Sequence, residues 1–127
     1  MNLEKVVFGF VIVLAATLNF GFFIGDIDNP AHHEVWGLFA AIAINLVATI
    51  LKFGDRTQIG ALHLATSLVA DLQLIAAAIA WAYAAHMSGD GVTAAAVARI
   101  VSLAGGALFA NFVSIVLLIG ETLMLRR

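Results

Sequence analysis

One apolar stretch, residues 59–83, limits most strongly what this chain can fold into. It reads IGALHLATSLVADLQLIAAAIAWAY and carries one formal charge, on Asp71, at its middle. A run of this length is long enough to cross the hydrocarbon core of a bilayer as a helix. An aspartate at that depth costs about 2.5–3.5 kcal/mol on insertion scales, so it usually marks a proton, ion or substrate path or a buried partner. Asp71 is therefore the strongest functional candidate in the sequence.

The composition places the whole chain in a membrane. Of its 127 residues, 63% are hydrophobic and only 11% are charged, whereas soluble domains have about 45–50% apolar and 25% charged residues. The absence of cysteine excludes disulfides and thiolate metal sites. A net charge of -2 gives no basic surface for nucleic acid, and no GxSxG or HExxH motif indicates a hydrolase. We predict an integral membrane protein that is not an enzyme.

Four apolar segments follow one another and predict an all-α fold of four transmembrane helices in a single domain, residues 1–127. The segments cover residues 5–25, 35–53, 59–83 and 100–125, and residues 94–99 either extend the fourth helix or form a short interfacial one. Lysine and arginine accumulate in cytoplasmic loops. The first connection, residues 26–34, has neither, and most of the cations fall on the other side: Lys5, Lys52, Arg56, Arg126 and Arg127. We predict that both termini are cytoplasmic and that the protein spans the cell (inner) membrane several times.

Strongly polar side chains lie at similar depth in all four segments. Asn45, Asp71 and Asn111 are at the midpoints of the second, third and fourth segments. Asn19 lies about 6 Å nearer the outer face, because a helix rises about 1.5 Å per residue. In hydrocarbon these groups must find partners within the protein. They either bond to one another as structural contacts or form a site in which Asp71 supplies charge and the amides supply neutral oxygens for a cation or proton.

The third segment is polar on two faces. His63, Ser67 and Asp71 are spaced by four residues and form one slanting stripe, whereas Gln73 lies on another face. A proton relay from His63 to Asp71 would need Ser67 or water as a bridge, since two helical turns separate them by about 12 Å. The second polar face suggests contact with a neighbouring subunit, and we expect a homo-oligomer.

The outer connections hold several groups that can bind cations. They are Asp26, Asp28, His32, His33, Glu34 and His86. Such a set would form a negative mouth that collects cations or a site for a transition metal. No HxxxH or HxxE spacing is present, so a solvated acidic loop is the default interpretation. Paired histidines that hold haem would be available only at this rim, from His32 or His33 with His86.

We therefore predict a small homo-oligomeric channel or transporter for a cation or proton in the membrane lipid. A subunit that packs against a larger membrane complex explains the small size and the two-sided polar helices equally well, and a bis-histidine haem protein is a third possibility. No cofactor is expected beyond a bound cation. The predicted ion path consists of Asn19, Asn45, His63, Ser67, Asp71, Gln73 and Asn111.

Overall fold

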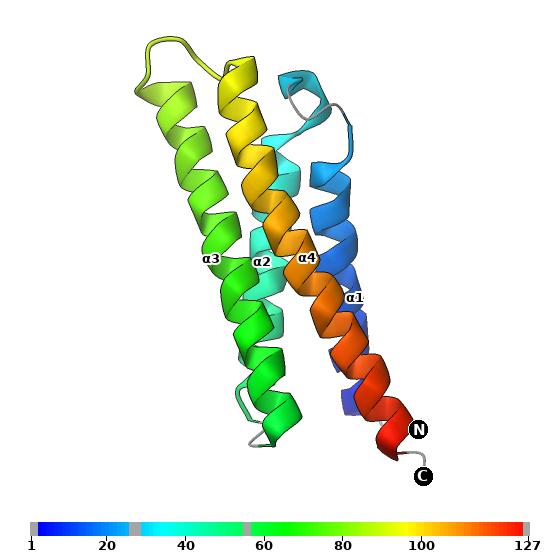
Figure 1. Ribbon diagram of the computed structural model, residues 1–127. Coiled ribbons are helices and arrows are strands. Elements are labelled where there is room, and N and C mark those ends of the chain that lie inside the picture. The colour runs from blue at the N-terminus through cyan, green and yellow to red at the C-terminus, as the bar shows by residue number, and fades with distance from the viewer. Residues whose placement is uncertain (1–2, 26–28, 55–56, 126–127) are drawn as a thin grey trace.

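The computed structural model describes residues 3–25, 29–54 and 57–125, without the side chains of His32 and Leu125. Four long helices form an antiparallel bundle (Figure 1). Each is long and apolar enough to cross a membrane, which confirms the predicted all-α fold with four spans. The protein is thus a multi-pass membrane protein. Its elements are α1 (Leu3–Phe23), the short 3-10 helix η1 (Pro30–His32), α2 (Val35–Lys52), α3 (Gln58–His86) and α4 (Ala94–Leu125).

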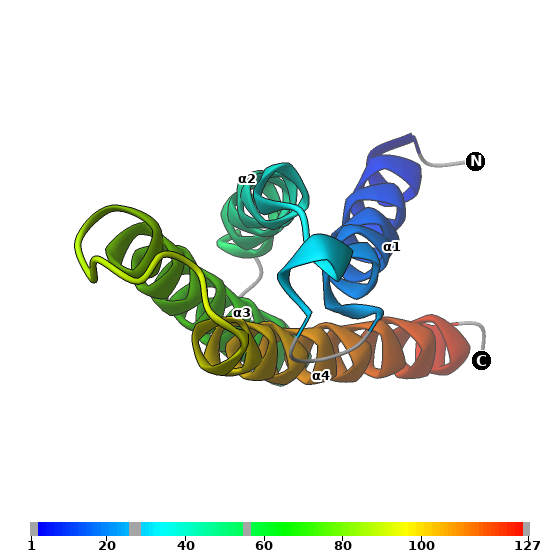
Figure 2. The same cartoon turned by 90° about the horizontal axis from the view of Figure 1, so that it is seen from above.

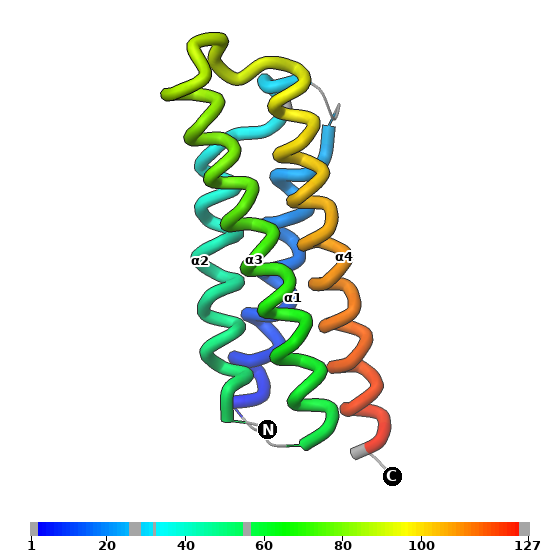
Figure 3. The backbone as a smooth tube through the Cα atoms, turned by 60° about the vertical axis from the view of Figure 1, so that its left-hand side comes forward, coloured from blue at the N-terminus to red at the C-terminus, as the bar shows by residue number. Residues whose placement is uncertain are grey.

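The two ends of the bundle differ in what they carry. The start of α1, the end of α2, the start of α3 and the end of α4 lie together at one end, which we call the termini end (Figures 1 and 3). The other end, the loop end, carries η1 and the α3–α4 loop. An even number of crossings requires this arrangement. The prediction that the termini end faces the cytoplasm stays a prediction.

Local sequence signals explain where α3 and α4 begin. Thr57 is the N-cap of α3, where its side chain accepts a hydrogen bond from the Gly60 N–H at 3.0 Å. Thr93 accepts similarly from the Ala96 N–H at 3.1 Å. The helix begins at Ala94, so the segment whose assignment was open forms the first turns of α4. In the preceding loop Gly89 has a φ of 81°, a conformation that glycine adopts without steric cost.

The helices form a ring in which each packs against two neighbours, and the α3–α4 contact is the most extensive. In Figure 2 α4 extends across the lower side of the view, whereas α2 is seen nearly end-on, so α4 is tilted relative to α2. Two glycines of α4 allow its close contacts, as small residues do between membrane helices. A Cβ on Gly105 would lie 2.7 Å from the ring of Phe23 in α1, and one on Gly106 would collide with the side chain of Gln73 in α3.

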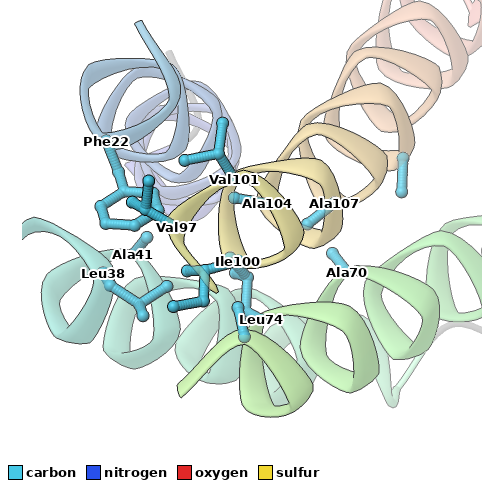
Figure 4. Packing of buried hydrophobic residues seen from close by; sticks show 12 residues of the cluster. Phe22, Leu38, Ala41, Ala70, Leu74, Val97, Ile100, Val101, Ala104 and Ala107 are labelled. Atoms are coloured by element: carbon cyan, nitrogen blue, oxygen red, sulfur yellow. The ribbon is translucent and has the colours of Figure 1, made fainter. Parts of the chain in front are cut away.

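The buried apolar core lies in the loop-end half of the bundle. Figure 4 shows side chains from all four helices meeting there, with Phe22, Leu38 and Leu74 among the largest. The other members are mostly alanine, which lets the backbones approach. The full cluster consists of Phe22, Leu38, Ala41, Ala70, Leu74, Ala77, Val97, Ile100, Val101, Ala104, Ala107 and Ala110.

The contact at Gly105 predicts a difference between two otherwise equivalent substitutions in α4. Gly105→Ala places a methyl group against Phe23, whereas Gly120→Ala meets nothing within 4 Å. Both variants gain the same helix propensity, so the difference between them isolates the steric cost. We expect Gly105→Ala to be less stable than Gly120→Ala by about 1–3 kcal/mol, measured as the free energy of unfolding in mixed micelles. Equal stabilities would contradict the packing described for α1 and α4.

Candidate functional site

Asp71 is buried, with 8% of its surface exposed, and it contacts α2. Its Oδ2 accepts a hydrogen bond from the Thr49 hydroxyl at 2.5 Å, while Oδ1 has no hydrogen-bond partner within the described part of the chain. The same hydroxyl lies 2.9 Å from the Asn45 carbonyl oxygen of its own helix. A threonine hydroxyl has one hydrogen and can donate to one acceptor at a time. The geometry therefore suits both an ionised Asp71, to which Thr49 donates, and a protonated Asp71, which donates to Thr49.

Lys52 lies one turn after Thr49 and points into the bundle, although it ends α2. Only 3% of its surface is exposed, and its Nζ donates to the Ser114 hydroxyl of α4 at 2.7 Å. Lys52 and Asp71 interact electrostatically without forming a direct ion pair. From the sequence, Lys52 served only to orient the chain, and the structure adds that its side chain is buried inside the bundle. A buried ammonium is expensive unless an opposite charge compensates it, and Asp71 supplies that charge.

His63 continues the polar contacts toward the termini end. Its ring is buried, with Nδ1 3.4 Å from the Ser114 Oγ and Nε2 3.9 Å from a carboxylate oxygen of Glu121. Ser114 accepts from Lys52, so its own hydrogen is available for Nδ1. The other ring nitrogen then carries the hydrogen and lies on the side of Glu121, at a distance longer than a hydrogen bond.

These contacts connect the middle of the bundle to its surface. The Glu121 side chain is 28% exposed, so the series opens at the termini end. Toward the loop end, Asp71 is followed by the apolar core, in which Leu38, Leu74 and Ile100 are fully buried. The polar series is thus open at one end and closed at the other. We call it the buried charge cluster: Thr49, Lys52, His63, Asp71, Ser114 and Glu121.

The asparagines expected to surround Asp71 have other partners. The Asn45 side chain donates to the Ala41 carbonyl of its own helix at 2.7 Å. The Asn19 amide has one orientation in which both its oxygen and its nitrogen find partners. In that orientation its oxygen accepts from the Asn111 side chain at 3.2 Å, and the amide also bonds to the α4 backbone. No hydrogen bond joins Asp71 to Asn45 or Asn111 among the described residues. The single layer expected from the sequence is split into an α1–α4 amide pair and the buried charge cluster.

The remaining residues of the predicted path fall on different faces of α3. Ser67 is buried on the same stripe as His63 and Asp71. Gln73 instead packs against Gly106 and lines a groove between α3 and α4. Thr66, also off the stripe, donates to the His63 carbonyl of its own helix at 2.7 Å. Thr66 therefore needs no partner from a neighbouring subunit.

The outer connection is organised by a buried histidine. His33 is 1% exposed, and its Nδ1 donates to the Phe22 carbonyl at 2.6 Å, which ties η1 to the end of α1. Glu34 and His86 are exposed. Asp26, Asp28 and the side chain of His32 lie outside the described residues. Within the described residues no three histidines or acids form a group suited to a metal ion.

Comparison with known proteins places the chain in a family. It belongs to a family of unknown function, DUF6394. The family model matches residues 32–122, a range that runs from η1 into the last turns of α4. The matched range contains every member of the buried charge cluster and excludes α1. No curated protein and no solved structure matches the chain. Function must therefore be argued from the chemistry of the cluster.

The predicted path lacks four members of the buried charge cluster: Thr49, Lys52, Ser114 and Glu121. A signal for Lys52 was present, because it follows Asn45 by seven residues and so shares its helix face. Thr49 lies on that face between them. Both were overlooked because Lys52 was assigned to topology and threonine is common in membrane helices.

The interaction between the two buried charges predicts non-additive stability. Asp71→Asn leaves Lys52 without its counter-charge, and Lys52→Met does the same to Asp71. We expect the double variant to be more stable than the sum of the single effects implies, with a coupling of about 0.5–3 kcal/mol. The free energy of unfolding in mixed micelles measures it. Lys5→Met, which removes an exposed lysine of α1, is the control and should show no coupling to Asp71→Asn. A coupling of zero for Lys52 would contradict the interaction.

Proposed function

We propose that the protein is a proton transporter in which Asp71 is the central protonation site. The observation that supports this most is the buried charge cluster, whose polar side chains extend from the partly exposed Glu121 through His63, Ser114 and Lys52 toward the buried Asp71. Intramembrane acids paired with basic groups are typical of proton relays. The apolar core beyond Asp71 favours a carrier, because an open pore would need a polar path on both sides.

A proton suits this site better than a metal cation does. Hard cations in proteins take about six oxygen ligands or more, and the asparagines expected to provide them bond to groups other than Asp71. The charge of Lys52 also lies near the carboxylate and would repel a bound cation. A proton needs only one acceptor and removes the negative charge that makes burial of Asp71 expensive.

The contacts suggest an order for the transfer. Lys52 first gives its proton to Asp71 and becomes a neutral amine. With His63 in the tautomer that carries its hydrogen on Nδ1, the amine takes the hydrogen of Ser114, Ser114 takes one from Nδ1, and Nε2 takes the proton that Glu121 has picked up. Lys52 is the donor nearest to Asp71 in this series. Thr49 then accepts from the protonated acid and donates to the Asn45 carbonyl. The steps through Ser114 follow the contacts described above, whereas the steps from Glu121 to His63 and from Lys52 to Asp71 need a bridging water or a movement of the side chains.

Sidedness and self-association are further parts of the proposal. The distribution of lysine and arginine supports a cytoplasmic termini end, so Glu121 would exchange protons with the cytoplasm. Association of several copies is supported only by the small residues on the helix surfaces. The cluster itself is formed by one chain.

Proton flux into vesicles tests the proposal directly. We expect purified protein in liposomes to acidify a dye-loaded lumen when a potassium diffusion potential is applied, with no matching flux of sodium. Asp71→Asn removes the titrating carboxylate and should reduce the flux to that of protein-free vesicles. Glu34→Gln, which neutralises an exposed carboxylate at the loop end, should conduct like the parent. Equal flux from the parent and Asp71→Asn would exclude the central role of Asp71.

The closed loop end also supports a second candidate, an accessory subunit of a larger membrane complex. A sealed bundle does not by itself conduct, and a partner could complete the path beyond Asp71. In that case the isolated protein would show no proton flux, and a larger membrane protein would co-purify with it in mild detergent. Recovery of a pure protein with flux and no partner would favour the transporter instead.

A further inference from the structure

We propose that the α3–α4 seam near the loop end binds a phospholipid whose headgroup carries a primary amine, such as phosphatidylethanolamine. The site is separate from the buried charge cluster and does not depend on proton transport. It consists of an apolar groove, a polar hollow and one arginine shared by both.

The groove is suited to an acyl chain. It has a volume of about 760 Å³ and is lined by Leu72 and Leu103, with the small residues Ala76 and Ala98 leaving the space between them. Leu72 is 70% exposed, so the groove lies on the outside of the bundle, where lipid tails are present. Its lining is predominantly apolar and includes Arg99.

The polar hollow lies on the other side of Arg99, toward the α3–α4 loop. It has a volume of about 460 Å³, and its lining includes Tyr83, Ser88, Asp90 and Thr93. Arg99 follows the first residue of α4 by five positions, which places its backbone about 7.5 Å below the helix start. Tyrosine and arginine at this level are typical of the headgroup region. The apolar groove therefore matches the acyl chains of a phospholipid, and the polar hollow above it matches the headgroup.

The two charges in the hollow identify the headgroup. Arg99 and Asp90 are both exposed and line the same space, but no ion pair joins them among the residues that the structure describes. A guanidinium binds phosphate through two parallel hydrogen bonds, and a carboxylate binds an ammonium. A zwitterion with phosphate and primary amine satisfies both. Phosphatidylcholine has no N–H to donate to Asp90, and phosphatidylglycerol has no cation.

Native mass spectrometry of the purified protein with each of these three lipids, matched in acyl chains, tests the site. We expect more bound phosphatidylethanolamine than phosphatidylcholine or phosphatidylglycerol. Arg99→Gln removes the phosphate contact and should weaken binding of all three by about tenfold. Asp90→Asn should abolish the preference for phosphatidylethanolamine over phosphatidylcholine and leave binding through the phosphate.

Two control variants separate the site from general charge effects. Lys5→Gln removes an exposed cation at the opposite end, and Glu34→Gln removes an exposed acid at the same end but outside the hollow. Both should bind lipid like the parent. A preference retained in Asp90→Asn, equal binding by the parent and Arg99→Gln, or a preference for phosphatidylglycerol would each overturn the proposal. A groove filled by a second copy would also overturn it, and would appear as a dimer that excludes lipid.

Discussion

Hydrocarbon offers no hydrogen-bond partners, and the structure depends on how each polar group inside the bundle finds one. Some hydroxyls bond to their own helix, as Ser102 does to the Ala98 carbonyl. Such bonds do not fix the position of one helix relative to another. The Asn19–Asn111 pair joins α1 to α4, and Thr49–Asp71 joins α2 to α3. Only contacts of this second kind fix one helix against another. They explain why the chain keeps costly polar groups at depths where alanine would pack more simply.

The four-span fold and the placement of Asp71 inside the bundle were predictable, because span length and the cost of a charge in hydrocarbon are properties of the sequence alone. The partners of Asp71 were not. Aligning helix midpoints placed Asn45 opposite it, but α2 has 18 residues and α3 has 29, so their midpoints need not lie at one level. Side chains also lean toward the N-terminus of their own helix. In an antiparallel pair this tilts Thr49 and Asp71 toward each other, and Thr49 becomes the partner.

The two halves of the bundle differ in what they bury: one packs small apolar side chains closely, and the other holds charged and polar side chains. Alanine, leucine and valine close the loop-end half, where close contact between backbones excludes water. The termini-end half holds Lys52 and His63, whose long polar side chains prevent such packing. Low dielectric strengthens every charge interaction there but also penalises any that is left uncompensated. A polar half that opens to one surface only keeps its charges in low dielectric and still lets each of them be compensated.

Thr49 connects the charge on Asp71 to the backbone of α2. With the acid ionised, the hydroxyl hydrogen points to Asp71, and the Asn45 carbonyl keeps only its helical bond. With the acid protonated, the Thr49 hydrogen points to the Asn45 carbonyl, and Asp71 becomes the donor in its hydrogen bond to Thr49. The same stretch of α2 ends at Lys52, which bonds to α4. A change of one proton at Asp71 would therefore reverse the hydrogen bond between α2 and α3, on the same stretch of α2 that holds α4 through Lys52.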